Sequence, residues 1–403
     1  MTARTSNDVS SPPSEHGQEF DLHGVVGVRL KDASAADAAL VRRQLGPLNR
    51  PLNREPDITI RFVDRATTKP LTYVALGESG FNDDGFFVLR TTVGGVSKAQ
   101  IPFPNVGQPL EIVCERTMPA VPHLLSLINL AALAKGVLPL HASAFTMAST
   151  GVLVTGWAKG GKTETLLACM SQGAQYVGDE WVYLTEDGQM LGLPEPIRVW
   201  AWHLQQLPSL LRSRPRKERF RLSTWRRLAE LTTAASRSSL PGAAILRKGA
   251  PVIGRQAYLQ IPPEDMFGPA KVSLHGVLGA VVLVVSCEAP DIAIEATSGS
   301  EIAHRMAASL SDERSKLVAT YNQFRFAYPD ARSPVIESAE IAEQRLLSTL
   351  LDRLPAAKVL HPYPCDVATL GRVVQSAALH AISTAVADDG PDLPRANVLA
   401  ESP

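Results

Sequence analysis

Residues 151–170 read GVLVTGWAKGGKTETLLACM, and this stretch decides the fold. It begins with a short apolar run, continues through a glycine-rich turn and ends in a segment without Gly or Pro. That order predicts a strand, a loop and a helix. Within it, the eight residues from Gly156 to Thr163 match G-x-x-x-x-G-K-[ST], a pattern that holds nucleotide phosphates when it lies between a strand and a helix. The alternative, a coincidental glycine-rich turn, fits the flanking strand and helix less well.

Each part of this loop has a predicted task. Its glycines bring backbone N–H groups close to phosphate oxygens, and the N-terminus of the following helix points at the anion. Lys162 is expected to reach the β- and γ-phosphates of ATP, and the Thr163 hydroxyl to hold Mg²⁺. The residues predicted to contact the nucleotide are Gly156, Trp157, Ala158, Lys159, Gly160, Gly161, Lys162, Thr163 and Glu164.

The composition is typical of a soluble globular protein. The chain has 403 residues, enough for two domains, and its 40 basic residues equal its 40 acidic residues. This balance argues against a nucleic-acid or membrane partner. The N-terminus lacks the apolar core of a signal peptide, and no apolar stretch approaches the ~20 residues of a membrane span. Four cysteines far apart in the sequence, Cys114, Cys169, Cys287 and Cys365, predict reduced, mostly buried thiols in a cytoplasmic protein.

The pattern of apolar residues suggests four regions. Residues 1–20 are rich in Ser, Pro and charge and are expected to form a disordered tail. Residues 21–135 combine alternating strands with a helical segment and predict a small α+β domain. Residues 136–375 contain the glycine-rich loop and a continuous apolar run at 276–285, which suits a central strand covered on both faces. Residues 376–403 are expected to form a C-terminal helix and tail.

Two strands next to the loop carry polar residues. A predicted strand at 138–145 forms a hairpin with residues 152–155 and places His141 near the nucleotide. Further on, the apolar segment 174–184 is interrupted by Asp179 and Glu180. Buried carboxylates are costly unless they meet a cation, and Mg²⁺ on the nucleotide is the natural one. A pair of charges at a strand end is the alternative.

These residues resemble the catalytic domain of HPr kinase/phosphorylase. The shared arrangement is a histidine in a strand about 15 residues before the loop, the loop itself, and two adjacent acids about 17 residues after its lysine. The resemblance covers about residues 136–200. It implies an α/β fold of the P-loop type shared with phosphoenolpyruvate carboxykinases, with a mixed sheet and helices. It also implies that Asp179 is the general base, that His141 orients or tunes that acid, and that Glu180 helps Thr163 and Asp179 hold Mg²⁺.

The sequence also departs from that family. The family more often has a second aspartate where this chain has Glu180, and the downstream signature E-V-R-G-[LIVM]-G is missing. This argues against HPr as the substrate. The chain is more similar to the diverse HPr kinase-related proteins of bacterial biosynthetic and regulatory gene neighbourhoods, some of which phosphorylate serine on peptides.

A basic insertion is expected at residues 205–255. Between Arg212 and Arg255 the chain has twelve basic residues against two acids, Glu218 and Glu230. This segment is interpreted either as a solvated flap or as a clamp for an acidic or phosphorylated acceptor. Nucleic acid is the weakest option, because a basic stretch alone is a poor indicator of it. Farther along, His361 is expected to be a hydrogen-bonded structural histidine rather than a ligand-binding one.

Three functions fit these observations. The first is an ATP- and Mg²⁺-dependent kinase acting on a serine-like hydroxyl of an acidic peptide, a protein or a small metabolite, with a possible homo-oligomeric state. The second is a nucleotide-binding regulatory ATPase or switch. The third is a carboxykinase-like enzyme, which would need a further set of metal ligands that the sequence does not show. His141 and Asp179 favour the first over the second, because a pure nucleotide binder needs no base.

Overall fold

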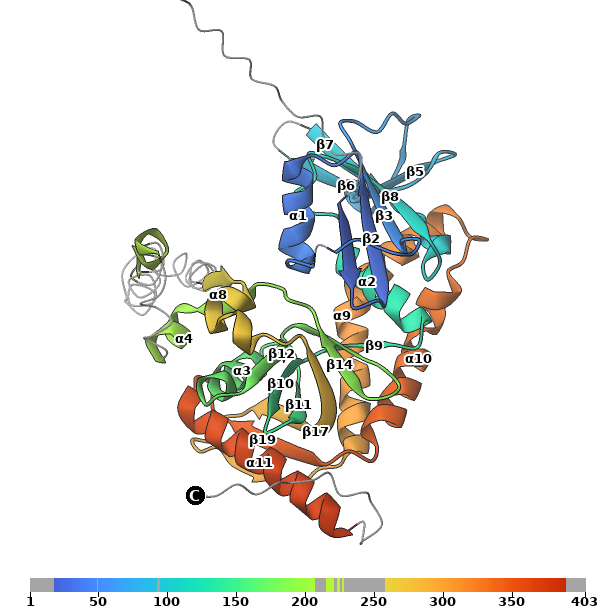
Figure 1. The fold of residues 1–403 in the computed structure, drawn as a ribbon. Helices are drawn as coiled ribbons and strands as arrows, with labels where there is room; N and C mark the ends of the chain where they lie inside the picture. The colour runs from blue at the N-terminus through green and yellow to red at the C-terminus, as the bar shows by residue number, and fades with distance from the viewer. Residues whose placement is uncertain are drawn as a thin grey trace, which may run out of the picture.

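The computed structural model describes residues 18–48, 50–92, 95–206, 215–220, 223–224, 227 and 258–388. Residues 1–17 of the predicted tail and most of the predicted basic insertion lie outside these ranges. The described chain forms mixed β-sheets covered by α-helices, which confirms the predicted α/β class. In Figure 1 the first sheet lies at the top, and the second sheet lies below it with the helices that follow.

The first sheet has eight strands in the order β1-β2-β3-β8-β7-β6-β5-β4. Strands β2, β3 and β8 are parallel, and the other neighbours are antiparallel. Helix α1 (Ala35–Leu45) connects β2 to β3 and begins with a capping box between Ser34 and Asp37. The strands are β1 (Glu19–Leu22), β2 (Val26–Lys31), β3 (Ile58–Val63), β4 (Thr72–Val74), β5 (Ser79–Asn82), β6 (Gly85–Thr92), β7 (Gly95–Gln100) and β8 (Leu110–Glu115).

The second sheet has nine strands, with the order β12-β10-β11-β17-β14-β13-β9 along its main path. The long strand β17 joins its parts: its start pairs antiparallel with β14, and the rest pairs parallel with β11 and β19. A separate ribbon pairs β15 (Ile197–Trp200) with β16 (Tyr258–Ile261). The strands of the sheet are β9 (Leu138–His141), β10 (Ser143–Met147), β11 (Thr150–Thr155), β12 (Gln175–Gly178), β13 (Trp181–Leu184), β14 (Gln189–Gly192), β17 (His275–Ser286), β18 (Ala293–Glu295) and β19 (Ala356–His361).

Helices cover β17 on both faces, as its continuous apolar sequence predicts. Val282 and Val284 belong to the core beneath α3 (Lys162–Ser171) and α11 (Val367–Asp388), whereas Val281 and Leu283 belong to the core on the opposite face. Helices α2 (Leu124–Ala134), α9 (Gly299–Ala327) and α10 (Pro334–Leu351) lie on that opposite face. The predicted boundary after residue 375 falls inside α11. The short helices α4 (Ala201–Gln206) and α8 (Pro263–Phe267) flank the β15–β16 ribbon.

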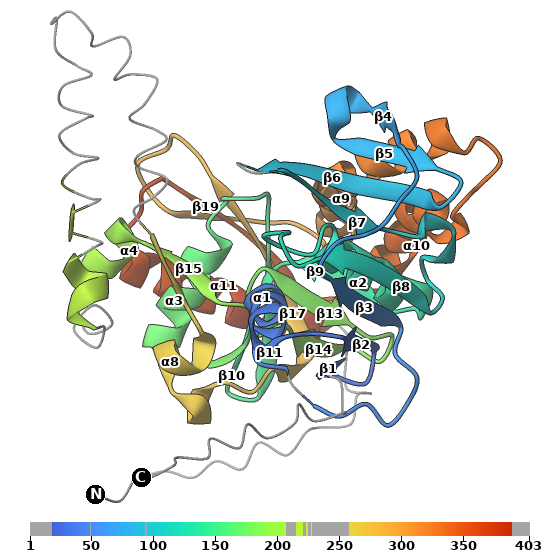
Figure 2. The same cartoon turned by 90° about the horizontal axis from the view of Figure 1, so that it is seen from above.

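Helix α9 connects the two sheets. It is 29 residues long and contacts β9 of the second sheet as well as β5 and β6 of the first. Figure 2 shows β6 lying across this helix. Near its C-terminal end, Phe324 packs against Phe86 and Phe103, with ring centroids 5.7 and 5.3 Å away. One hydrophobic core therefore continues from the first sheet to the second.

Two predicted strands are each divided in the structure. The segment 138–145 breaks at Ala142: β9 pairs with β13, whereas β10 forms the predicted hairpin with β11. The segment 174–184 breaks at Asp179 and Glu180, and Glu180 has a positive φ of 66°. At each break the chain passes between two pairs of strands of the second sheet: β9 with β13 on one side, and β10 with β12 on the other. The four cysteines all lie in the described ranges, where they are free, and Cys114, Cys169 and Cys365 are buried, as predicted.

Candidate functional site

The two strand breaks lie side by side and bring four polar residues together. The backbone N–H of Ala142 donates to the carbonyl of Glu180 at 3.2 Å. Across the paired strands, His141 is opposite Trp181 and Ala144 is opposite Gly178. Because polar residues flank the first break and occupy the second, the side chains of His141, Ser143, Asp179 and Glu180 gather at one place in the sheet.

The glycine-rich loop connects β11 to α3 and requires glycine at two positions. Gly161 is the N-cap of α3 with φ 106°, and a Cβ there would lie 2.2 Å from Nε2 of His361. Gly156 has φ 152°, and its Cβ would lie 2.5 Å from the carbonyl oxygen of Val284. No side chain in the described ranges caps α3. The first N–H groups of this helix are therefore available to an anion.

His361 supports the loop from β19. The side chain is fully buried, and its ring nitrogens lie 2.9 Å from the carbonyl oxygen of Gly160 and 2.8 Å from that of Pro362. This agrees with the interpretation of His361 as a hydrogen-bonded structural histidine. The histidine also explains why position 161 has no room for a side chain.

Lys162 is folded over the loop. Its Nζ donates to the carbonyl oxygens of Gly156 at 3.0 Å and Trp157 at 3.1 Å, and its side chain is buried. Burial lowers the pKa of Lys162, although the charges of Glu180 and Asp179 oppose this shift. The lysine is therefore an enclosed cation at the place where the sequence predicts phosphate binding.

Asp179 is the most enclosed acid of this group, with 3% of its surface exposed. Its carboxylate accepts hydrogen bonds from the hydroxyl of Ser143 and, at 3.1 Å, from that of Thr163. Burial and the neighbouring charge of Glu180 raise its pKa to about 7, against these hydrogen bonds and the charge of Lys162. The structure thus places Asp179 directly against the loop. Ser143 was not predicted, because a serine in an apolar strand carries no recognisable signal.

His141 forms hydrogen bonds with two other acids. Its Nε2 lies 3.1 Å from Oε2 of Glu180, and its Nδ1 contacts Glu313. Burial alone would lower the pKa of His141, but these two hydrogen bonds raise it overall. The same contact with His141 is the main cause of the lowered pKa of Glu180. The structure does not bring His141, predicted to orient or tune Asp179, into contact with that acid: the β9–β13 register directs His141 to Glu180, while Asp179 accepts a hydrogen bond from Ser143.

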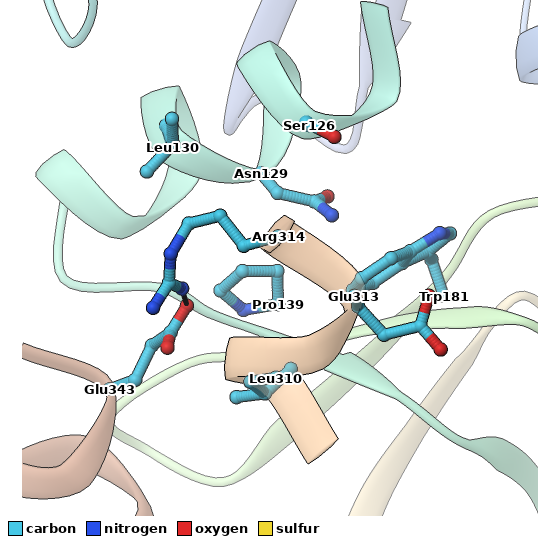
Figure 3. A pocket seen from close by; sticks show the side chains of 9 residues that line it. All are labelled: Ser126, Asn129, Leu130, Pro139, Trp181, Leu310, Glu313, Arg314 and Glu343. Atoms are coloured by element: carbon cyan, nitrogen blue, oxygen red, sulfur yellow. Dashed lines mark hydrogen bonds and ion pairs between the residues drawn. The ribbon is translucent and has the colours of Figure 1, made fainter. Parts of the chain in front are cut away.

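Glu313 comes from the middle of α9. Figure 3 shows Glu313 beside Trp181, while the next residue, Arg314, extends in the opposite direction to an ion pair with Glu343. A small cavity of about 20 Å³ lies between these side chains. Glu313 is 172 residues from His141 in sequence. Sequence reasoning missed it because one acid on a long helix has no motif around it.

A cavity of about 460 Å³ lies beside the loop and is lined by His141, Lys162, Asp179, Glu180 and Glu313 among others. Of the predicted site residues, Gly156, Trp157 and Gly160 do not line it, and the Trp157 side chain is exposed. Glu164 lines it with its carboxylate 3.0 Å from Nε2 of the buried His203. The full lining is His141, Ala158, Lys159, Gly161, Lys162, Thr163, Glu164, Asp179, Glu180, Arg198, Trp200, His203, Glu313, Lys316 and Tyr363.

The donors next to the loop suit a magnesium ion bound together with phosphates. No cluster of three or more His, Cys, Asp or Glu side chains in the described ranges has the arrangement of a metal site. Magnesium in phosphoryl-transfer sites needs only one or two carboxylates, because phosphate oxygens and water complete its coordination. Thr163 and Asp179 offer a hydroxyl and a carboxylate at one point, whereas Glu180 is engaged by His141.

Comparisons with known proteins assign no family to this chain. No protein-family model matches the chain, and no curated protein matches it. Among solved structures, the HPr(Ser) kinase/phosphatase from Coxiella burnetii is similar to 62% of this chain and 99% of its own, with 11% sequence identity and a TM-score of 0.22. Among the helices that the structure describes, none has the length and apolar character needed to cross a bilayer.

Proposed function

We propose that this protein is an ATP- and Mg²⁺-dependent phosphotransferase that moves the γ-phosphoryl group to a hydroxyl of a peptide, a protein or a small molecule. One observation carries the proposal. The hydroxyl of Thr163, from the glycine-rich loop, lies 3.1 Å from the buried carboxylate of Asp179, which follows a different strand. The loop proposed to bind phosphate and the acid proposed to take the proton both line the same cavity, which supports the proposal.

The loop residues would hold the nucleotide. The first N–H groups of α3 point at an anion bound in the loop, and Lys159 and Lys162 line the same space. To contact phosphate, Lys162 exchanges its hydrogen bonds with the carbonyls of Gly156 and Trp157 for charge-assisted ones. Thr163 and Asp179, with Glu180 nearby, would hold Mg²⁺, which supplies charge neutralisation at the phosphates.

The transfer itself needs positioning and one proton acceptor. The acceptor oxygen forms a bond to the γ-phosphorus as the bond to the bridging oxygen of the β-phosphate breaks, and ADP leaves with that electron pair. Asp179 takes the proton of the acceptor hydroxyl. His141 lies between Glu180 and Glu313 and keeps Glu180 in place beside Asp179.

Transfer of labelled γ-phosphate tests this function. The purified protein is incubated with Mg²⁺ and ATP labelled on the γ-phosphate, first alone and then with products of neighbouring genes and with serine peptides. We expect an acid-stable label, as a phosphate ester of a hydroxyl is, on one acceptor, and no label with Lys162→Ala, which removes a charge without emptying a hydrophobic core. Release of free phosphate without labelled acceptor would favour the regulatory ATPase instead. Failure of the wild-type protein to bind Mg²⁺-ATP would refute both.

A further inference from the structure

The β15–β16 ribbon forms a wall of the cavity. Along β15, Ile197 and Val199 are buried in the core, so the alternate residues Arg198 and Trp200 face the other way and line the cavity. The guanidinium of Arg198 lies 5.3 Å from the centre of the Tyr258 ring. That ring is also 5.3 Å from the ring of Trp200. A cation over an aromatic face is held in position while its N–H groups stay free to bind.

Helix α9 provides a second cation. Lys316 follows Glu313 by three residues, so both side chains lie on the same face of the helix, and both line the cavity. Glu313 contacts His141, so Lys316 lies about one helical turn from the residue that contacts the histidine. Arg198 lines the same cavity as Glu180 and Glu313, and its charge adds to the hydrogen bond of His141 in lowering the pKa of Glu180.

Within the described part of the chain neither cation forms an ion pair, whereas the four acids that line the cavity are all engaged. Glu164 is bound to His203, Asp179 accepts from Ser143 and Thr163, and Glu180 and Glu313 contact His141. By contrast, no carboxylate in the described ranges forms an ion pair with Arg198 or Lys316. Lys159 and Lys162 belong to the loop that faces the phosphates.

We propose that Arg198 and Lys316 form a subsite for an anionic group, a carboxylate or a phosphate, that the acceptor carries next to its reacting hydroxyl. This inference rests on the proposed phosphotransferase function. An anionic acceptor would otherwise be repelled by Asp179 and Glu180, and two cations on that side of the cavity offset the repulsion. The planar guanidinium suits bidentate binding of a carboxylate or phosphate, and lysine adds a point charge.

The test compares anionic probes with matched neutral ones. Two short serine peptides are used, one with Asp and Glu beside the serine and one with Asn and Gln. Glycerate and glycerol 3-phosphate are compared with glycerol, so that the two arms separate a peptide acceptor from a small one. Binding is measured by calorimetry with and without Mg²⁺ and a non-hydrolysable ATP analogue. We expect at least one anionic probe to bind more tightly than its neutral partner, with a difference that shrinks as salt is added.

The variant Arg198→Gln with Lys316→Gln should weaken binding of the anionic probe about tenfold, as expected for losing two charge-assisted hydrogen bonds at an open site. Its affinity for the ATP analogue should stay within about twofold of the wild type. The control, Lys271→Gln with Arg345→Gln, makes the same change in net charge at two exposed positions outside the cavity. This control should bind every probe as the wild type does.

Several outcomes would overturn the subsite. The subsite is wrong if anionic and neutral probes bind equally, if no probe binds, or if the control variant loses as much affinity for the anionic probe. It is also wrong if affinity for the ATP analogue falls in parallel, because that would assign the cations to the nucleotide. Failure of the proposed function has a different signature. The wild-type protein would then not bind the ATP analogue, while the nucleotide-free measurements would still show whether Arg198 and Lys316 bind an anion.

Discussion

The carboxylate of Asp179 lies 3.1 Å from the hydroxyl of Thr163, and this contact joins the end of β12 to the start of α3. Asp179→Asn keeps the shape of the side chain but removes its ability to take a proton. We therefore expect nucleotide binding to be retained at least in part and phosphoryl transfer to fall by about 10²-fold or more, the usual size of a general-base contribution. Single-turnover transfer and equilibrium ATP binding, measured on the same preparation, separate the two effects.

Ser143→Ala is the matched control for this prediction. It removes a hydrogen bond from the Asp179 carboxylate but leaves the carboxylate in place. A smaller loss of transfer than in Asp179→Asn is expected. If Asp179→Asn transfers phosphate at the wild-type rate, Asp179 has no part in the proton transfer.

The second prediction concerns His141 and Glu313, which we expect to act as one unit. Glu313→Gln and His141→Ala should each lower kcat/KM less than Asp179→Asn does, because their task is to hold Glu180 and not to take the proton. The double variant should lose no more than the worse single variant, since residues of one unit are not additive. Initial rates at several ATP concentrations provide the test. Fully additive losses would show that the two residues act separately.

The sequence predicted the part of the site that lies close to the loop along the chain. Asp179 and Glu180 were placed near the loop because two acids in an apolar strand need a cation, and Asp179 does contact the loop residue Thr163. The apolar run of β17 likewise indicated a strand covered on both faces. These predictions used local patterns, and local patterns determine which elements form and which face of each is buried.

The rest of the site depends on long-range packing that no local pattern reports. His141 was assigned to Asp179, but the pairing of β9 with β13 brings it to Glu180. Glu313 reaches His141 because α9 (Gly299–Ala327) packs against β9, a contact between segments 172 residues apart in sequence. Arg198 faces the cavity because of its position along β15. Most of the predicted basic insertion lies outside the described residues.

The third prediction concerns the buried ion pair between Arg314 and Glu343. Their side chains are 10% and 5% exposed, and burial raises the pKa of Glu343 even though Arg314 lowers it. Arg314→Met leaves the carboxylate without its partner and should lower the free energy of unfolding by about 3–5 kcal/mol. Adding Glu343→Leu removes the stranded charge and should restore most of that loss. Urea unfolding monitored by tryptophan fluorescence provides the measurement.

The exposed Arg345 lies two residues after Glu343 on α10 and provides a control for the loss of a positive charge. Arg345→Gln should shift the free energy of unfolding by less than about 0.5 kcal/mol. The prediction is wrong if Arg314→Met loses less than about 1 kcal/mol, or if the double variant is less stable than Arg314→Met alone.

The last prediction concerns pH and a histidine that joins the two sheets. Nε2 of His23 lies 2.7 Å from the carbonyl oxygen of Gly192, which can only accept, and Nδ1 lies 3.2 Å from Nε2 of His275. Neutral His23 donates to the carbonyl and accepts from His275. Burial is the main cause of its lowered pKa; the Gly192 carbonyl and Asp21 oppose the shift, and His275 and Arg50 add to it.

Because the pKa is lowered on folding, the unfolded chain binds this proton more readily than the folded chain. His23 therefore leaves stability unchanged well above the unfolded pKa of about 6.5, and it destabilises the fold as the pH falls through that value. His23→Gln, which keeps an N–H donor for Gly192, should lose less stability than the wild type between about pH 7.5 and pH 5. His304→Gln, at an exposed position on α9, should follow the wild type. Parallel curves for His23→Gln and the wild type in urea unfolding would show that protonation of His23 does not weaken the contact between the sheets.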